Sequence, residues 1–467
     1  MSQFINREDE LASLQREYDR KGSSLVIMYG RRRVGKTRLI TKFIENKNAL
    51  FFLASEESEA QNRTEFKNRA ADFLNNDLLR NADVSSWDLI FKEIINKHFE
   101  EKPVIVIDEF QYIGKSDPAF LSVFQRIWEE ELKDRDVMVI LCGSLISMMR
   151  SQTLDYSSPL YGRRTAQICL KQISFRHYKG FFPGKKEKEL IELYSVTGGV
   201  PKYIELIGKE KDIFTSVKNN VLERSSYLYD EPEFLLQQEV SEIGSYFSVI
   251  KSIASGNRKL SDIAASIGLK ATGITKYLKT LIDLDLVERE VPVTESNPEK
   301  SKKGLYVIKD NYISFWFKFV YPYKSFIESG NADHVMEKIR QGFVQNHVSY
   351  VYEDICREKM QMMNMQGDLP FHFSKIGRYW DKNTEIDIVA LDTDPNRIIF
   401  GECKYRKELM GTDVLKALEA KAKNVAWNKD NREEWFVLFS SSGFTKALKK
   451  EAEARKDVAL YGGNEAV

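Results

Sequence analysis

Residues 30–37 have the residue types and the spacing of a phosphate-binding loop. The stretch GRRRVGKT places four residues between Gly30 and Gly35 and continues with Lys36 and Thr37. The two glycines let backbone amides wrap closely around phosphate oxygens, and a helix that follows adds the positive end of its dipole. Lys36 would then reach the β- and γ-phosphates of ATP, and Thr37 would hold Mg²⁺. The loop amides also include those of Arg31, Arg32, Arg33 and Val34. We expect the three arginine side chains to point outward, into solvent or toward a neighbouring domain.

Two carboxylates follow an apolar run further along the chain. Val104–Ile107 indicates a buried strand, which delivers Asp108 and Glu109 to its carboxyl end. Asp108 would hold Mg²⁺ through water, and Glu109 would orient or deprotonate the water that attacks the γ-phosphate. Alone, an Asp-Glu pair after a strand is as well explained by a capped strand end. Beside a phosphate loop, it predicts ATP hydrolysis.

A third set of chemical side chains lies near the C-terminus, on two expected strands at 384–391 and 398–405. Side chains two positions apart share a face of a strand, so the two strands can bring one cluster together. Its members are Asp387, Glu402 and Lys404, and Glu353 could join them from a helix expected at 343–360. Clustered carboxylates repel one another unless a cation lies between them, and oxygen ligands suit Mg²⁺ or Mn²⁺. Such a metal could activate water against a phosphodiester, with Lys404 assisting. The alternative is a salt-bridged hairpin face.

The elements that must position the first two motifs are apolar strands that alternate with helices. The expected strands are 24–29, 49–54, 103–107 and 137–142, and the expected helices are 37–46 and 118–132. Continuous apolar runs of this kind predict a parallel sheet that is covered on both faces. The fold class is therefore α/β, with the parallel sheet of a P-loop NTPase.

Three segments outside the phosphate loop have the sequence of recognisable motifs. They are FINREDEL (Phe4–Leu11), ILCGSLISMM (Ile140–Met149) and TGGVPKY (Thr197–Tyr203). Together with the phosphate motifs they resemble the AAA-like ATPases often called archaeal ATPases, within the signal-transduction ATPases. The resemblance covers about residues 1–320. It implies a sheet followed by a helical lid that carries the TGGVPKY segment.

The same resemblance implies further nucleotide-site residues. Ser144 falls at the polar sensor position after the fourth strand. PLYGRR (Pro159–Arg164) matches a region with candidate transition-state arginines, so Arg163 and Arg164 could neutralise γ-phosphate charge, in cis or across a subunit interface. A surface pair is an equal alternative.

The segment from Lys259 to Val291 has the pattern of a helix-turn-helix followed by a wing. Two amphipathic helices flank Gly268, and two short strands are expected at 286–293 and 304–308. This predicts a winged helix whose second helix enters a DNA major groove. The phosphate-contacting lysines would be Lys270, Lys276, Lys279, Lys300, Lys302 and Lys303. The alternative is a packing module between domains.

The C-terminal cluster resembles the PD-(D/E)XK nuclease superfamily over about residues 335–445. Asp387 matches the aspartate of that motif, and Glu402-Cys403-Lys404 matches its glutamate-x-lysine, although Ile386 replaces the proline. The resemblance implies a restriction-endonuclease-like α/β domain. An inactive relative of that fold, used only for recognition, is the alternative.

Composition limits the remaining classes of function. The chain has 467 residues, enough for two to four domains, and a net charge of +1, which gives no whole-protein argument for nucleic acid. Four cysteines without a CxxC pair favour a reducing compartment. The sequence has no signal-peptide pattern and no run of 18 apolar residues, so we expect a cytoplasmic protein that does not interact with membranes.

The leading hypothesis is a three-part machine. An AAA-like ATPase with its lid would occupy 1–235, a winged helix 236–325, and a nuclease-like domain 330–467. ATP would control how the last two parts act on DNA. The competing hypothesis is an ATP-dependent switch that binds DNA or protein without cleaving. A homo-oligomer or a protein partner is compatible with both.

Overall fold

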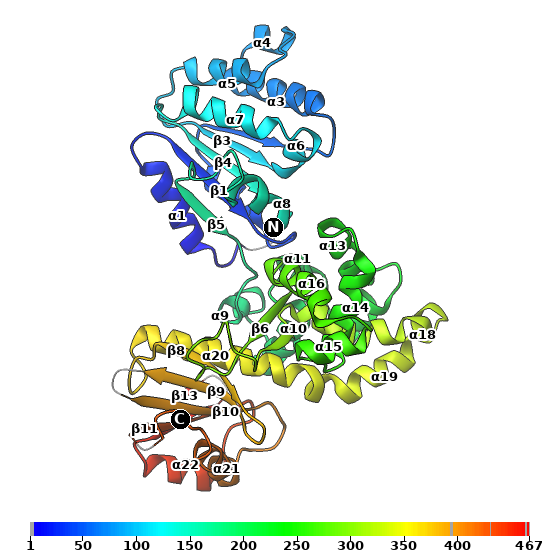
Figure 1. Ribbon diagram of the computed structural model, residues 1–467, viewed down its shortest axis with the longest axis vertical. Coiled ribbons are helices and arrows are strands. Elements are labelled where there is room, and N and C mark those ends of the chain that lie inside the picture. The colour runs from blue at the N-terminus through cyan, green and yellow to red at the C-terminus, as the bar shows by residue number, and fades with distance from the viewer. Residues whose placement is uncertain (1–3, 393–395, 430, 463–464, 467) are drawn as a thin grey trace. The chain divides into compact units, whose positions relative to one another are not determined.

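The computed structural model describes residues 4–392, 396–429, 431–462 and 465–466. The chain divides into two compact units (Figure 1). Unit 1 runs to Ile173 and also includes Val200–Lys202 and Gln237–Ser241. Unit 2 contains Ser174–Gly199, Tyr203–Leu236 and the chain from Glu242 onward.

Unit 1 is built on a five-stranded sheet with the strand order β2-β3-β4-β1-β5, in which every pair is parallel. The strands are β1 (Ser24–Tyr29), β2 (Ala49–Leu53), β3 (Val104–Asp108), β4 (Met138–Gly143) and β5 (Ala166–Cys169). All side chains of β1, β3 and β4 are buried, so both faces of the sheet are covered. The expected parallel sheet is confirmed. Strand β5 was not predicted, because it is short and partly exposed.

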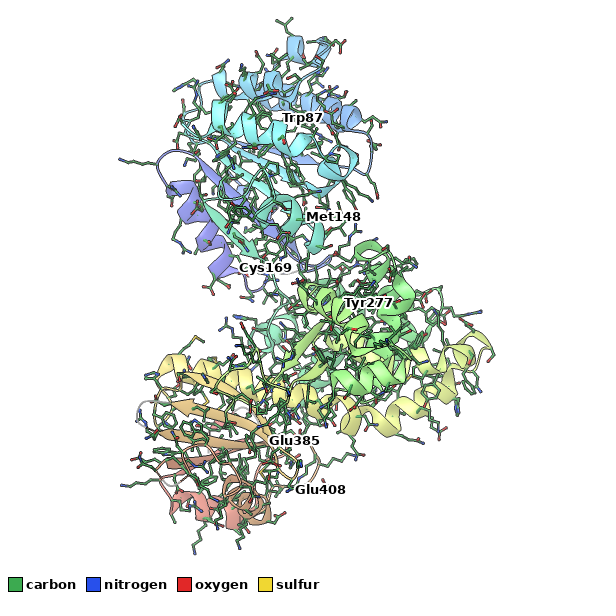
Figure 2. All side chains as sticks on the ribbon, viewed as in Figure 1. Trp87, Met148, Cys169, Tyr277, Glu385 and Glu408 are labelled. Atoms are coloured by element: carbon green, nitrogen blue, oxygen red, sulfur yellow. The ribbon has the colours of Figure 1, made fainter. Side chains whose placement is uncertain are left out.

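Helices lie on both faces of this sheet. They are α1 (Glu8–Asp19), α2 (Lys36–Ile44), α3 (Glu59–Leu74), α4 (Asp77–Asn81), α5 (Trp87–Asn96), α6 (Gln111–Ser116), α7 (Phe120–Ile127) and α8 (Ile146–Met149), with π-helical turns η1 (Trp128–Leu132) and η2 (Arg150–Leu154). Leu14 of α1 and Leu39 of α2 share one core with alternate strand residues such as Val26 and Val106. On the other face, Phe66 of α3 contacts Trp87 of α5 with ring centroids 5.2 Å apart. Figure 2 labels Trp87 among the side chains of this unit.

Unit 2 begins with helices. They are α9 (Phe175–Tyr178), η3 (Lys179–Phe181), α10 (Glu187–Thr197), α11 (Pro201–Ile207), α12 (Ile213–Val217), η4 (Lys218–Leu222), α13 (Glu231–Glu239), α14 (Ile243–Ala254), α15 (Leu260–Ser266) and α16 (Ala271–Asp283). The two-stranded antiparallel hairpin of β6 (Val287–Glu290) and β7 (Leu305–Ile308) follows. The expected helix, turn, helix and hairpin are therefore present in this order. Their assignment as a winged helix stays a prediction.

A second helical group leads from the hairpin into the C-terminal sheet. It comprises α17 (Asn311–Phe319), η5 (Tyr321–Tyr323), α18 (Lys324–Glu328), α19 (Ala332–Phe343), η6 (Val344–Val348) and α20 (Ser349–Gln366). His347 of η6 is buried, and its Nε2 lies 2.6 Å from the carbonyl oxygen of Ser195 in α10. The helices expected to form the ATPase lid thus pack, within unit 2, against elements far along the chain.

The C-terminal sheet has the strand order β13-β12-β11-β10-β9-β8. Its elements are β8 (Lys375–Trp380), β9 (Glu385–Asp392), β10 (Arg397–Lys404), α21 (Thr412–Ala422), β11 (Glu433–Ser440), α22 (Lys446–Glu453), β12 (Val458–Gly462) and β13 (Glu465–Ala466). Strands β8 to β10 pair antiparallel, and β10 to β12 pair parallel. Helix α20 lies over one face, and α21 and α22 lie over the other (Figure 1). The expected boundaries at 235, 325 and 330 stay predictions.

Candidate phosphate and carboxylate sites

The phosphate loop connects the end of β1 to the start of α2. Gly30 has a φ of 157°, and a Cβ atom at this position would lie 2.3 Å from the carbonyl oxygen of Leu170. Only glycine tolerates that approach, because real Cβ atoms do not come so close to backbone. Gly35 caps the helix with a φ of 96°, again in the left-handed region. The backbone conformation and close packing therefore explain why both positions of the motif are glycine.

The amine of Lys36 is folded back onto the loop. Its Nζ donates to the carbonyl oxygens of Gly30 at 2.8 Å and Arg31 at 2.9 Å. Lys36 is buried, and this burial lowers the pKa of its amine. A desolvated cation held only by carbonyl oxygens is well placed to exchange them for phosphate oxygens.

An arginine of the N-terminal FINREDEL segment also holds the phosphate loop in place. Arg7 is buried, and its Nη2 donates to the carbonyl oxygens of Val34 at 3.1 Å and Lys171 at 2.6 Å. Its Nη1 donates to Glu10 at 3.1 Å. The resemblance of this segment to the ATPase family predicted no role for Arg7. Arg7 fixes the end of the phosphate loop against the segment after β5.

Thr37 and Asp108 meet beside the loop. The Thr37 hydroxyl donates to Asp108 Oδ2 at 2.7 Å, and the backbone N–H of Glu109 donates to Asp108 Oδ1 at 2.9 Å. Asp108 is 1% exposed and ends β3, whereas Thr37 is exposed on the first turn of α2. A hydroxyl and a carboxylate oxygen side by side are suitable ligands for Mg²⁺.

Glu109 is held in a strained conformation by two hydrogen bonds. Its φ of 53° lies in the left-handed region, which costs a non-glycine residue about 1–3 kcal/mol and recurs at functional sites. Its Oε2 accepts a hydrogen bond from the Ser144 hydroxyl at 2.6 Å and another from the Gln111 side chain. The structure thus brings together Glu109 and Ser144 from the ends of β3 and β4. Gln111 was not predicted to belong to this site, because it matches no part of the phosphate motifs.

The three loop arginines do not behave alike. We expected all of them to point outward, and this is wrong for Arg31, which is only 6% exposed. Arg32 is half-buried, and its Nη2 donates to the Tyr112 hydroxyl at 2.6 Å. Arg33 is half-buried, with a φ of 70°. The burial of Arg31 comes from the surrounding fold, which a local sequence pattern does not reveal.

Arg163 and Arg164 lie between η2 and β5. Arg163 Nε lies 2.9 Å from Glu129 Oε1, and its Nη1 donates to the Pro159 carbonyl at 2.8 Å. Arg164 is half-buried. These contacts of Arg163 are with residues outside the phosphate loop, so its role at the γ-phosphate stays a prediction.

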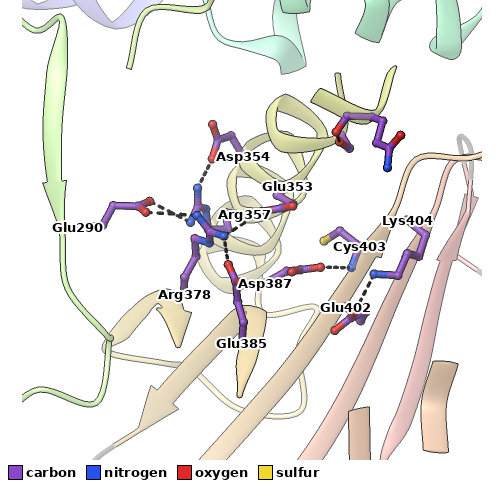
Figure 3. A network of polar contacts seen from close by, with 12 residues as sticks. Glu290, Glu353, Asp354, Arg357, Arg378, Glu385, Asp387, Glu402, Cys403 and Lys404 are labelled. Atoms are coloured by element: carbon purple, nitrogen blue, oxygen red, sulfur yellow. Dashed lines mark hydrogen bonds and ion pairs between the residues drawn. The ribbon is translucent and has the colours of Figure 1, made fainter. Parts of the chain in front are cut away.

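The C-terminal cluster forms where β9 and β10 pair. Asp387 Oδ2 accepts a hydrogen bond from the Cys403 backbone N–H at 2.9 Å (Figure 3). Glu402 is buried and accepts from Lys404 Nζ at 2.6 Å and from Lys421 Nζ of α21 at 2.9 Å. Burial and the neighbouring Glu402 raise the pKa of Asp387. The structure therefore brings Asp387, Glu402 and Lys404 together, as expected.

Glu353 approaches Asp387 from α20. Burial, and then the charge of Asp387, raise the pKa of Glu353 to about 8. Its Oε2 lies 3.8 Å from Arg378 Nη2, and the same guanidinium contacts Glu385 and lies 3.5 Å from Glu290 of β6 (Figure 3). Arg378 was not anticipated, because nothing in its local sequence indicates this network.

The expected trio of metal ligands is not assembled. Within residues 4–392, 396–429, 431–462 and 465–466, no three His, Cys, Asp or Glu side chains are grouped so that they could hold a metal ion. Glu353 comes from the helix over one face of the sheet, and Glu402 faces Lys421 on the other. Only Asp387 and Glu402 remain as a pair of candidate ligands, and Glu402 already has two cationic partners.

The hairpin strand β6 and its loop contact the C-terminal sheet. The Val293 backbone N–H donates to the Arg378 carbonyl at 2.9 Å, and Trp380 Nε1 donates to the Lys303 carbonyl at 3.2 Å. Lys303 pairs with Glu295 at 2.8 Å, and Lys276 of α16 lies 3.6 Å from Glu242. The other four of the expected phosphate-contacting lysines are exposed: Lys270, Lys279, Lys300 and Lys302.

Two family models match parts of the chain, and one of them covers the phosphate loop. Residues 4–207 match the model of an ATPase domain predominantly from Archaea, and residues 316–424 match a model described as archaeal and bacterial proteins of unknown function. The "Uncharacterized protein MJECL04" of Methanocaldococcus jannaschii is 38% identical over 414 residues, which are 88% of this chain and 90% of that protein. The "Uncharacterized ATP-binding protein MJ0423" of the same organism is 57% identical over 44 residues, 9% of this chain and 75% of that protein.

Two solved structures are similar in part. The Walker-type ATPase PABY2304 of Pyrococcus abyssi is 17% identical with a TM-score of 0.48, and 68% of this chain covers 96% of that one. The Aeropyrum pernix ORC2 protein is 15% identical with a TM-score of 0.45, and 71% of this chain covers 96% of it. Both TM-scores are too low to carry a functional argument.

Within the part of the chain that the structure describes, no helix has the length and apolar character to cross a membrane.

Proposed function

The chain belongs to the family that it shares with the Methanocaldococcus jannaschii protein MJECL04 and has an ATPase domain of the predominantly archaeal type, and from this premise we propose that residues 30–37 bind ATP with Mg²⁺ for hydrolysis. The observation that carries the proposal is the contact of Thr37 with Asp108 beside a glycine-shaped loop. It sets a hydroxyl and a carboxylate next to the place where loop amides and Lys36 would hold phosphates.

Mg²⁺ fits this site because its two oxygen donors already lie 2.7 Å apart. Thr37 would hold it directly, and Asp108 would hold it through water. Held there, Mg²⁺ would neutralise negative charge on the phosphates.

The remaining roles belong to side chains of the chain itself. Lys36 would exchange the carbonyl oxygens of Gly30 and Arg31 for the β- and γ-phosphate oxygens. Glu109 would accept a hydrogen bond from the attacking water and take up its proton. Ser144 would hold the Glu109 carboxylate in place, because its hydroxyl donates to Oε2 at 2.6 Å. Arg163 would contact the γ-phosphate only after it leaves Glu129. Arg164 is the other candidate for this role.

ATP binding tests the site assignment. Lys36→Ala should abolish the binding of ATP and Mg²⁺ that calorimetry measures for the wild type. Lys42→Ala is a matched control, because Lys42 lies on the same helix, is exposed and pairs with Glu45 at 2.6 Å. Removal of Mg²⁺ with a chelator should weaken ATP binding to the wild type. Equal affinity in wild type and Lys36→Ala would refute the assignment.

The expected winged helix, residues 236–325, favours the hypothesis that DNA is the substrate or partner. The exposed Lys270 and Lys279 lie at the start and on the surface of α16, and Lys300 and Lys302 lie on the hairpin loop. We assign this module as a winged helix that contacts DNA phosphates. Affinity for duplex DNA should fall steeply with salt and should fall further in Lys270→Ala/Lys279→Ala. Binding that is independent of salt and of these lysines would favour a protein partner, as in the switch hypothesis.

A metal-dependent endonuclease is the second candidate. The observation in its favour is the pairing of Asp387, Glu402 and Lys404 on adjacent strands, with a raised pKa for Asp387. The fit to a metal is partial, so we derive no hydrolytic step through Mg²⁺ or Mn²⁺. Nicking of supercoiled DNA in either metal that is lost in Asp387→Ala would support cleavage. DNA binding without nicking would support a recognition domain instead.

A further inference from the structure

A cavity of about 120 Å³ lies in unit 2, where Glu353 and Arg378 line it but Asp387, Glu402 and Lys404 do not. Its wall is formed by the segment after α14, the hairpin strands β6 and β7, and helices α17 and α20. Arg258, Lys318, Ser314 and Glu288 are among the residues that line it. A single buried water needs about 10–15 Å³, so the cavity has room for a small polyatomic ion.

Two cations face this cavity without an acidic partner. Arg258 Cζ lies 5.4 Å and Lys318 Nζ lies 5.3 Å from the ring centroid of Tyr350. Lys318 Nζ also donates to the Asn346 carbonyl at 2.9 Å. Among the residues that the structure describes, neither cation forms an ion pair with a carboxylate. Two like charges held beside one ring repel each other unless an anion lies between them.

The other charges of the wall largely compensate one another. Arg357 and Arg378 lie 3.4 and 3.5 Å from Glu290. Glu288 also lines the cavity. Within the described part of the chain, its carboxylate has no hydrogen bond or ion pair. Burial, and then Glu290, raise the pKa of Glu288, which weakens its negative charge. The other two carboxylates of the wall, Glu353 and Asp354, lie beside Arg378 and Arg357. The lining thus has five cations, which also include Lys309, against four carboxylates, and burial raises the pKa of Glu353 as well, so the surplus charge is positive.

We propose that this cavity binds a phosphate group between Arg258 and Lys318, independently of the ATP site. The planar guanidinium of arginine matches two oxygens of a tetrahedral oxyanion, and the lysine ammonium adds a third donor group. The Ser314 hydroxyl on α17 is a further donor in the wall, and a protonated Glu288 can also donate. Burial and the neighbouring Arg258 lower the pKa of Lys318 to about 8, as expected for two cations without a counter-ion.

Calorimetry with inorganic phosphate tests the site in the full chain. The protein is first saturated with ADP and Mg²⁺, so that the phosphate loop is filled. We expect saturable binding of one phosphate to the wild type, weakened about tenfold or more in Lys318→Met and in Arg258→Gln, because each removes a charge-assisted hydrogen bond. Lys251→Met is the matched control, since Lys251 is exposed and lies 5.5 Å from the Tyr321 ring outside the cavity.

A second measurement guards against variants that fold poorly. Phosphate should raise the Tm of the wild type and of Lys251→Met, and should leave the Tm of Arg258→Gln/Lys318→Met unchanged. Duplex DNA, titrated in parallel, distinguishes the source of the phosphate group. Equal weakening for DNA and free phosphate in the two variants indicates a nucleic-acid backbone, and weakening for free phosphate alone indicates a small ion. No saturable phosphate binding by the wild type, or equal affinity in all variants, would overturn the proposal.

Discussion

Removal of the Ser144 hydroxyl should slow ATP hydrolysis without weakening ATP binding. Ser144 Oγ donates to Glu109 Oε2 at 2.6 Å, and Ser144 is only 1% exposed, so water cannot readily replace it. A hydrogen bond to a charged group contributes about 1.5–3 kcal/mol, and each 1.36 kcal/mol corresponds to a factor of about ten in rate. Because Gln111 still holds the same oxygen, we expect the lower end, a fall in kcat of about tenfold in Ser144→Ala.

The assay is steady-state phosphate release over a range of ATP concentrations. The KM for ATP should stay near the wild-type value, because Ser144 contacts Glu109 and not the phosphate loop. Ser147→Ala is the control: its hydroxyl also donates to a carboxylate, that of Glu239, at 3.0 Å, but this carboxylate lies outside the proposed catalytic group. A raised KM with an unchanged kcat, or an equal loss of kcat in both variants, would refute the reasoning.

Three further predictions test other parts of the structure. Gly30→Ala should abolish ATP binding in a calorimetric titration, because its Cβ would lie 2.3 Å from a backbone oxygen, whereas Gly184→Ala has open space and no left-handed backbone, and should bind normally. Arg7→Ala should raise the KM for ATP more than it lowers kcat in phosphate-release assays, because two loop-side carbonyls lose their donor. Glu353 has a pKa near 8 in the folded chain against about 4.5 unfolded, so its contribution to stability is complete below pH 4.5 and is lost as the pH rises through 8. The Tm of unit 2 should therefore fall between about pH 4.5 and pH 8 and level off above that, and Glu353→Gln should flatten the fall in calorimetric scans.

Local patterns predicted the parts of unit 1 that local physics determines. The strands at 24–29, 103–107 and 137–142 are continuous apolar runs, and they lie within one residue of β1, β3 and β4. The glycines of the phosphate loop were predictable for the same reason, since backbone conformation demands them. The helix expected at 118–132 instead ends as the π-helical turn η1, which no spacing pattern indicates.

Contacts between distant segments were beyond the reach of the sequence. Arg7 contacts Lys171, 164 positions away in the sequence, and Arg378 contacts Glu290 of the hairpin. Neither the FINREDEL segment that contains Arg7 nor the local sequence around Arg378 indicates these partners. Strand alternation predicted that Asp387, Glu402 and Lys404 come together, but the position of Glu353 depended on which side of the sheet α20 covers. The sequence therefore predicted the pair of strands and not the separation of the expected metal ligands.

The most direct test of the central claim is hydrolysis of radiolabelled ATP by the wild type, Lys36→Ala and Glu109→Gln in Mg²⁺. The wild type should release phosphate, Lys36→Ala should neither bind nor hydrolyse ATP, and Glu109→Gln should bind ATP but turn it over slowly. Hydrolysis at the wild-type rate by both variants would contradict the assignment of the ATP site.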